Sequence, residues 1–320
     1  MRFSVVVPTY HRPNALRACL ESLLTQEFGT HGFEVIVVDD GDDTTTRGVV
    51  DELATRLAIR YLARSAREGP AAVRNQGAEL AIGEYLAFMD DDCEPESGWL
   101  RSLDAAIRAD EQPEAVVFGG RTVNRDPSNV YSTASQNLID FLYAWYNADP
   151  HHSRFFATNN IAVSRGSFRT FGGFDVSFPR AAAEDRDFCD RWREKGGRLE
   201  YVPEAAVRHM NRLSLQTFIR QHSGYGRGAV YLHNARRRRG ASLPRIEPIR
   251  FYRRLVFWPL GRGFGWRTPT LLLLAAVSQA SYAFGYYTEQ LRRRWKGTSV
   301  ETGELAAVSM PSVQEKVGRP

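Results

Sequence analysis

The sequence predicts an α/β fold in which helices flank a mostly parallel central sheet and a basic, helical appendage follows. Short apolar runs begin at Phe3, Phe33 and Tyr85, and their β-branched and aromatic residues are typical of buried strands. Stretches with helical periodicity separate these runs. Strand, loop and helix therefore alternate along the chain, which is the pattern of a right-handed parallel sheet.

The first 96 residues contain four predicted strands and three predicted helices. The strands cover 3–7, 33–38, 59–62 and 85–89, and the helices cover 14–24, 44–57 and 70–80. Three of the strands end in Pro-Thr-Tyr, Asp-Asp-Gly and Asp-Asp-Asp. Since ligands of parallel sheets bind outside the carboxyl ends of the strands, we expect these three loops to share one edge.

The acid run Asp90-Asp91-Asp92 directly follows a buried strand. Like charges this close repel strongly at low dielectric, so a bound cation is the favoured interpretation. Ligands that are all oxygen favour a hard ion, Mg²⁺ or Mn²⁺. The alternative is a solvated acidic turn in which an Asp caps the next helix.

The region from residue 97 to about 230 is less regular. Its predicted elements are a helix over 99–109, a strand over 115–119, an aromatic helix or acceptor wall over 131–146, an apolar strand with amides over 155–163, a helix over 186–195 and a final strand over 201–209. Aromatic stripes of this kind most often pack in a core, although aromatic faces also stack on sugars.

Charge is distributed unevenly along the 320 residues. Residues 1–204 hold 22 Lys and Arg against 32 Asp and Glu, whereas residues 205–300 hold 18 against two. The basic part suits an anionic membrane or a phosphorylated substrate, and a nucleic-acid arm is the competing interpretation that we do not favour. Three scattered cysteines and a strand that follows Met1-Arg2 without a signal peptide predict a cytoplasmic protein.

Two phosphate-binding motifs are missing. Gly-x-Gly-x-x-Gly does not follow the first strand, and Gly-x-x-x-x-Gly-Lys-Ser/Thr occurs nowhere in the sequence. Dinucleotide and P-loop cradles are therefore disfavoured. Phosphate charge would instead meet a metal and basic side chains.

Several motifs in register resemble family 2 glycosyltransferases, which have the Rossmann-like GT-A fold. They are Val-Val-Pro-Thr-Tyr, Val-Val-Asp-Asp-Gly, Arg-Asn-Gln-Gly, Phe-Met-Asp-Asp-Asp, Phe-Gly-Gly-Phe-Asp and Glu-Asp-Arg-Asp-Phe. The resemblance covers residues 3 to about 230. It implies a nucleotide-sugar half over 1–96 and an acceptor half over 97–230.

The resemblance also implies roles for individual residues. The donor nucleotide would meet Pro8, Thr9, Tyr10, Asp39, Asp40, Arg74, Asn75 and Asp91. Asp90, Asp92 and His209 would hold Mn²⁺ or Mg²⁺, Asp185 would act as the base beside Glu184, and Asn160, Gly173 and Asp175 would face the sugar or acceptor. Taken singly, each residue has an ordinary structural explanation, such as a turn acid or a helix-start acid.

The implied activity is inverting transfer of a single sugar from a nucleotide-diphosphate sugar to a hydroxyl acceptor, a sugar or a lipid-linked sugar. The Gln-x-x-Arg-Trp of processive synthases is missing, which favours single transfer, in cell-surface polysaccharide or glycolipid synthesis. Two alternatives stay open. One is a non-catalytic, membrane-associated sugar or nucleotide binder, and the other is a related nucleotidyltransferase.

The appendage over 231–296 mixes arginines with aromatic residues, as membrane-interface segments do. Within it, 268–288 is uncharged and, as a helix, about 30 Å long. Because polar residues interrupt this stretch, we favour a helix on the inner face of the cell membrane or in a homodimer interface over a transmembrane span. The polar tail, 297–320, is expected to be disordered.

Overall fold

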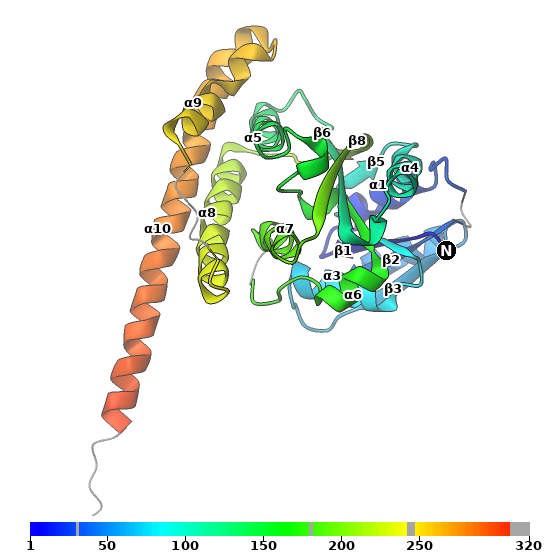
Figure 1. The fold of residues 1–320 in the computed structure, drawn as a ribbon, viewed down its shortest axis with the longest axis horizontal. Coiled ribbons are helices and arrows are strands. Elements are labelled where there is room, and N and C mark those ends of the chain that lie inside the picture. The colour runs from blue at the N-terminus through cyan, green and yellow to red at the C-terminus, as the bar shows by residue number, and fades with distance from the viewer. Residues whose placement is uncertain (30–31, 179–181, 242–246, 308–320) are drawn as a thin grey trace, which may run out of the picture.

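A single eight-stranded sheet organises the protein (Figure 1). The structure, a computed structural model, describes residues 1–29, 32–178, 182–241 and 247–307, with side chains as far as residue 295. The strand order is β3-β2-β1-β4-β7-β6-β8-β5. The α/β class is confirmed, but the sheet is mixed, since only its first four strands form a wholly parallel block.

The parallel block matches the predicted strand–helix alternation. It contains β1 (Phe3–Thr9), β2 (Phe33–Asp39), β3 (Ile59–Ala63) and β4 (Tyr85–Phe88), with α1 (Pro13–Leu23), α2 (Thr44–Leu53) and α3 (Pro70–Leu80). Local chemistry sets the helix starts: Pro13 and Pro70 occupy first-turn positions, where a missing N–H costs nothing, and the Asp43 side chain accepts from the backbone N–H of Thr45.

The second half of the sheet runs in both directions. Its strands are β5 (Cys93–Pro95), β6 (Val116–Asn124), β7 (Ile161–Ser164) and β8 (Arg198–His209), and its helices are α4 (Trp99–Ala109), α5 (Val130–Tyr146), α6 (Arg165–Phe171) and α7 (Glu184–Glu194). Short 3₁₀ turns are η1 (Pro113–Ala115), η2 (Pro150–His152), η3 (Thr158–Asn160), η4 (Trp258–Gly261) and η5 (Gly265–Arg267). The strand expected over 155–163 thus begins only at Ile161, because its amides form η3.

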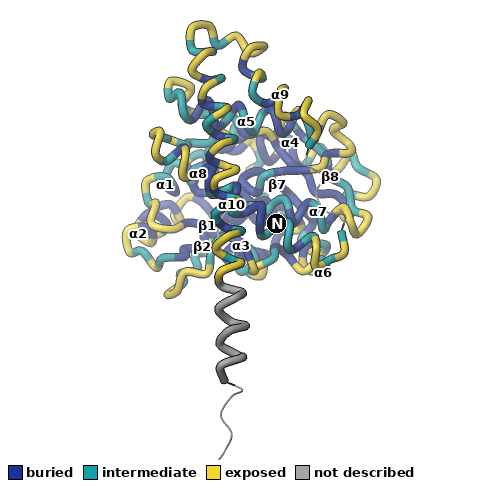
Figure 2. Tube along the Cα trace, turned by 90° about the vertical axis from the view of Figure 1, so that its left-hand side faces the viewer, coloured by how far each residue is buried: buried dark blue, intermediate teal, exposed yellow. Residues whose placement is uncertain are grey.

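Two apolar layers enclose the sheet, and the strands lie at the buried centre of the protein (Figure 2). The first layer places residues of α1, α2 and α4, including Leu20 and Trp99, against one face. The second places residues of α3, α6 and α7, including Phe168 and Phe188, against the other. Near-continuous burial of β1 and β2 follows from this double cover.

Three helices follow the sheet: α8 (Leu215–Arg238), α9 (Ile249–Phe257) and α10 (Thr268–Ala307). Helices α8 and α10 lie side by side at the edge of the globular part (Figure 1). A Cβ atom at Gly226 would collide with the carbonyl of Tyr282, and one at Gly285 would collide with that of Ser223. These two glycines therefore allow the backbones to approach closely.

Helix α10 extends beyond the predicted uncharged stretch. It continues to Ala307, through the first part of the segment expected to be disordered, whereas the rest of that segment, 308–320, lies outside the described residues. Within the described part of the chain, no helix is both long enough and apolar enough to cross a bilayer. Buried Ser278, Ser281 and Glu289 account for this, because the face of α10 against α8 carries polar groups.

Candidate functional site

The acid run meets the last sheet strand, β8, through short strand β5. Cys93 pairs with His209 in the antiparallel register of β5 and β8, and the backbone N–H of Met210 donates to the carbonyl of Asp92 at 2.8 Å. As a result, Nε2 of His209 lies 3.2 Å from Oδ1 of Asp92. Two residues 117 positions apart in the sequence thus lie in contact, and both were expected to hold the metal.

The donor atoms at this point fit a hard divalent cation. Asp92, Cys93 and His209 bring their ligand atoms within 4.8 Å of one another. Burial would raise the pKa of Asp92, but its hydrogen bond to His209 and the charges of His209 and Arg12 lower it overall, so the carboxylate is anionic. Burial holds the pKa of the Cys93 thiol well above its usual value, so Cys93 stays neutral and packs in the core. Carboxylate and imidazole remain as the donors, which suits Mn²⁺ or Mg²⁺.

The middle acid of the run, Asp91, turns inward. The hydroxyl of Thr9 donates to its Oδ2 at 2.8 Å. Burial, with the neighbouring Asp92 charge, raises the pKa of Asp91 to about 7. Thr9 and Asp91, both expected to face the donor, are therefore mainly a buried pair that supports the loop.

Arg12, which the sequence analysis did not identify, contacts two of the three acids. Its Nη1 lies 3.3 Å from Oδ1 of Asp91 and 2.8 Å from Oδ2 of Asp92. The side chain is more than half exposed. The available signal was an arginine in the loop directly after the first strand, at the same sheet edge as the acids.

Arg74 joins the acid run to the start of α7. It is 3% exposed, its Nη2 lies 2.6 Å from Oδ1 of Asp90, and its Nη1 lies 3.1 Å from Oε1 of Glu184. Arg74 was expected to approach the donor base or diphosphate, and in the structure its guanidinium is shared between two acids. Arg74 thus joins Asp90, which is 16 positions away in the sequence, and Glu184, which is 110 positions away, in one cluster.

Glu184 and Asp185 occupy the first turn of α7 and have raised pKa values. Burial and the Asp185 charge raise the pKa of Glu184 to about 7, although Arg74 opposes them. Burial also raises the pKa of Asp185, with Arg186 opposing. Oδ1 of Asp185 accepts from the backbone N–H of Arg186 at 2.7 Å, and the residue is half-buried, whereas Glu184 is only 3% exposed. Asp185 is therefore the better placed of the two to meet a substrate.

The loop after β2 uses its acids largely for its own architecture. Asp39 accepts from the backbone of Gly41 and Asp43 and from the Tyr61 hydroxyl, at 2.8–3.0 Å. Asp40 accepts from the backbone of Glu68 and Gly69 at 2.8 and 3.0 Å. These bonds shape the edge beside α3, and a nucleotide base would have to use the remaining lone pairs of Asp40.

Pro8 and Tyr10 lie on the same edge, at the end of β1. Pro8 is half-buried, and Tyr10 is 38% exposed. Arg67, another residue missed from the sequence, places its guanidinium 4.3 Å from the centre of the Tyr10 ring. The exposed ring is available for stacking. The end of β1 and the loops over 39–43 and 90–92 are called the acidic edge below.

Asn75 and Gly173 have structural partners rather than a ligand-facing position. The side chain of Asn75 both donates to the carbonyl of Phe174 and accepts from its N–H, each at 2.9 Å. Gly173 has a φ of +66°, and a Cβ atom there would collide with the Asn75 amide. These bonds connect α3 to the 173–175 loop, and the predicted contacts of Asn75 with the donor and of Gly173 with the acceptor stay predictions. Asp175 is half-exposed and accepts from the N–H of Ser177 at 2.8 Å.

Asn160 is a core residue, contrary to the expected contact with the donor sugar. It is fully buried, its Oδ1 accepts from Trp99 Nε1 at 2.8 Å, and its Nδ2 donates to the carbonyls of Arg121 and Ala205. These bonds use both polar ends of the amide. The sequence could not distinguish this role, since a buried polar residue and a ligand-binding one have the same identity.

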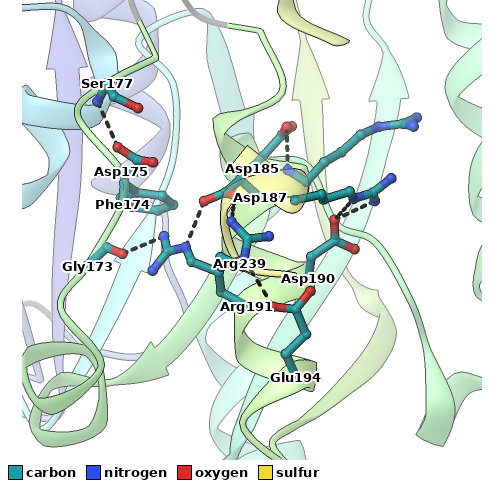
Figure 3. A network of polar contacts seen from close by, with 12 residues as sticks. Gly173, Phe174, Asp175, Ser177, Asp185, Asp187, Asp190, Arg191, Glu194 and Arg239 are labelled. Carbon is teal, nitrogen blue, oxygen red and sulfur yellow. Dashed lines mark hydrogen bonds and ion pairs between the residues drawn. The ribbon is translucent and has the colours of Figure 1, made fainter. Parts of the chain in front are cut away.

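A buried ion network fixes α7 from the opposite side (Figure 3). Asp187 is fully buried and accepts from Arg191 Nε at 2.7 Å and from Arg239 Nη1 at 2.6 Å. Arg191 also donates to the carbonyl of Gly173 at 2.8 Å, and Arg236 donates to Asp190 at 2.7 Å. The arginine run at the end of α8 is therefore partly consumed in holding α7, rather than being a free basic surface.

Helix α8 places Tyr225 near these acids. Burial raises the pKa of Tyr225 to about 12, and the charges of Asp185, Asp90 and Asp92 contribute to this shift. The Tyr225 hydroxyl accepts from Gln221 at 2.6 Å. The run after β4 and the pair that begins α7 thus lie in one region of the molecule, where Arg74 connects them.

Comparison with known proteins agrees with this geometry. The profile of "Glycosyl transferase family 2" matches residues 4–172. A Pre-mycofactocin glycosyltransferase of Mycobacterium tuberculosis is 31% identical over 234 residues, 72% of this chain and 47% of the relative, so the chain spans about half the length of that curated relative.

Two solved structures share the fold. The mannosyltransferase of Pyrobaculum calidifontis, in complex with GDP-Man and Mn²⁺, has a TM-score of 0.58 at 21% identity, over 88% of this chain and 75% of that one. TarS 1-349 of S. aureus has a TM-score of 0.55 at 18% identity, over 92% of each chain. Because the family profile covers more than half of the sequence, the chain belongs to glycosyl transferase family 2.

Proposed function

We propose that this protein is a divalent-metal-dependent, inverting glycosyltransferase that moves one sugar from a nucleotide-diphosphate sugar to an acceptor hydroxyl. The observation that carries the proposal is the Arg74 bridge, which brings Asp90 of the acidic edge and Glu184 beside Asp185 into one cluster. Support for the donor and the metal also comes from the related fold that was solved with GDP-Man and Mn²⁺.

The acidic edge would bind the donor. Tyr10 offers an exposed ring to the base, and Asp40 offers its remaining lone pairs. Asp92 and His209, with Asp90 beside them, would hold Mn²⁺ or Mg²⁺. A bound divalent cation would supply positive charge to the leaving diphosphate. Arg12, which is partly exposed, would add charge on the same side.

Asp185 would act as the general base. Its carboxylate takes the proton of the acceptor hydroxyl while that oxygen forms a bond to the anomeric carbon. The bond from the anomeric carbon to the diphosphate oxygen breaks, and the nucleoside diphosphate leaves with the electron pair. Attack opposite the leaving group inverts the anomeric centre. A raised pKa makes Asp185 a better proton acceptor than an ordinary aspartate.

The proposed acceptor is a sugar or lipid-linked sugar of a cell-surface polysaccharide or glycolipid, met at the inner face of the cell membrane. Support comes from large apolar side chains of the C-terminal segment that are more than 60% exposed, namely Trp266, Leu273, Phe284, Tyr287 and Trp295. Arginines accompany them at 262, 267 and 292–294. An interfacial helix combines these two properties, and a second copy of the chain is the alternative cover for this face.

A donor panel tests the catalytic proposal. Nucleoside diphosphate release would be measured for the wild-type chain with Mn²⁺, with Mg²⁺ and with EDTA. We expect release that depends on the metal and that Asp92→Ala abolishes, whereas the control Asp51→Ala, on exposed α2, retains it. Equal release by the Asp92→Ala variant, with or without metal, would refute the catalytic metal site.

Vesicle sedimentation tests the membrane proposal. We expect the wild-type chain to sediment with vesicles that contain phosphatidylglycerol. The double change Trp266→Ser and Phe284→Ser should release it, and Ile82→Ser, at an exposed apolar site on the globular part, should not. Sedimentation that all three chains share would contradict a role for the C-terminal segment.

A further inference from the structure

A patch of aromatic rings and arginines lies next to Asp185, on the side away from the acidic edge. Arg186, the neighbour of the proposed base, places its guanidinium carbon 4.6 Å from the centre of the Phe155 ring and 5.8 Å from that of Tyr146. Arg154 approaches the same Tyr146 ring at 5.6 Å. We call this set, together with Tyr282 of α10, the aromatic–arginine wall.

The C-terminal segment completes this wall. The hydroxyl of Tyr146, at the end of α5, donates to Oε1 of Glu247 at 2.9 Å. Tyr282 is 37% exposed and lies close enough to Arg186 for the guanidinium charge to lower the pKa of its phenol, although burial raises that pKa overall. Glu247, just before α9, therefore borders the wall directly through Tyr146.

The charge of Arg186 is not neutralised within the described part of the chain. No carboxylate there forms an ion pair with its guanidinium, and the carboxyl oxygen of Asp185 accepts from its backbone N–H instead. By contrast, Arg74, Arg191, Arg236 and Arg239 around the same helix all have acidic partners. The guanidinium of half-buried Arg186 therefore lies beside aromatic rings, and its N–H donors have no anionic partner among the described residues. They are able to bind the anionic group of a ligand.

We propose that the aromatic–arginine wall is an acceptor subsite for a phosphorylated glycoside, in which Arg186, aided by Arg154, binds the phosphate and the rings of Tyr146 and Tyr282 contact the sugar. A guanidinium binds phosphate oxygens in a bidentate manner, and aromatic faces pack against sugar rings. The position beside Asp185 would bring a hydroxyl of the same molecule to the base. This inference rests on the proposed function for its role in transfer, but the binding itself does not.

Binding measurements with the full chain in EDTA test the subsite, since without a divalent metal the acidic edge repels anions. The probes are phenyl phosphate and the neutral phenyl β-D-glucoside, titrated by calorimetry. We expect phenyl phosphate to bind and Arg186→Ala to weaken that binding about fivefold or more, with Arg186→Lys intermediate because it keeps the charge but not the fork. Arg193→Ala, an exposed arginine on the same helix, is the matched control and should not change it.

A second arm identifies the source of the phosphate. Vesicles of phosphatidylcholine with phosphatidic acid present the same group as a lipid headgroup. If Arg186→Ala weakens the binding of phenyl phosphate, the result supports a soluble phosphorylated acceptor. If it weakens only the binding of the vesicles, the result supports a lipid-linked acceptor. Affinity that Arg186→Ala leaves unchanged in both arms overturns the subsite. Failure of the proposed function can be distinguished from failure of the subsite. In that case the wild-type chain would release no nucleoside diphosphate from any donor, but it would still bind phenyl phosphate through Arg186.

Discussion

The acidic edge and the aromatic–arginine wall both lie beside the proposed base, Asp185. They differ in how their charged side chains are paired. At the edge, Asp39, Asp40 and Asp91 are occupied by hydrogen bonds from the protein itself. On the wall, Arg186 has aromatic rings around it and no acid paired with it among the described residues. The hydrogen bonds at the edge hold its acids in place without a ligand, whereas the proposed subsite would gain the counter-charge of Arg186 from a bound ligand.

The largest expected effect is on the residue between these regions. Asp185→Asn removes the proton acceptor and should lower transfer by roughly 10²- to 10⁴-fold. Donor binding should persist, because the acidic edge is intact. Transfer rates and donor affinity, measured side by side, check this, with Asp51→Asn as the exposed control. Full transfer by Asp185→Asn would assign the base elsewhere.

Arg74 connects the acidic edge to α7, so its loss should separate them. Arg74→Met leaves Asp90 and Glu184 without their shared counter-charge, and breaking such a buried pair costs about 3–5 kcal/mol. Chemical denaturation would measure the change in free energy of unfolding. The double variant with Glu184→Gln should recover part of it. A loss no larger than that of Arg67→Met, at the surface, would argue against the bridge.

The raised pKa values of the Glu184–Asp185 pair predict the direction of the pH dependence. The base works when ionised, and a raised pKa means that the ionised form is lost at a higher pH than for an ordinary carboxyl. The acid limb of kcat/KM should therefore lie at a higher pH than the limb of an ordinary aspartate would. In Glu184→Gln the neighbouring charge is absent, so the limb should move to lower pH. A limb that Glu184→Gln leaves unmoved would contradict this coupling.

The smallest effect is expected where the C-terminal segment docks. Gly285→Ala forces α10 away from the Ser223 carbonyl and should destabilise the protein by about 1–3 kcal/mol. Because Tyr282 is one turn away, the variant should also weaken binding of phenyl phosphate while donor affinity stays constant. Calorimetry on both ligands separates the wall from the edge. Gly261→Ala, in open space, is the matched control.

The sequence by itself determined the strand–helix alternation, the common edge of the three polar loops and the chemical identity of the acids. Continuous apolar runs such as those starting at Phe3 and Phe33 are typical of strands that are buried on both faces of a sheet. The positions of these strands therefore follow from the sequence pattern alone. The motifs also located Asp92 and Asp185 in chain order.

Only the tertiary structure decided what each polar group binds. Asn75, Asn160 and Arg74 match ligand-facing positions in the sequence. In the structure Asn75 bonds to Phe174, Asn160 to Trp99 and Arg74 to Glu184, and these partners are 99, 61 and 110 positions away. Arg186 is notable for the opposite reason, since no carboxylate among the described residues forms an ion pair with it. A hydrogen bond or an ion pair depends on distance in space, and a linear pattern records the group but not the distance.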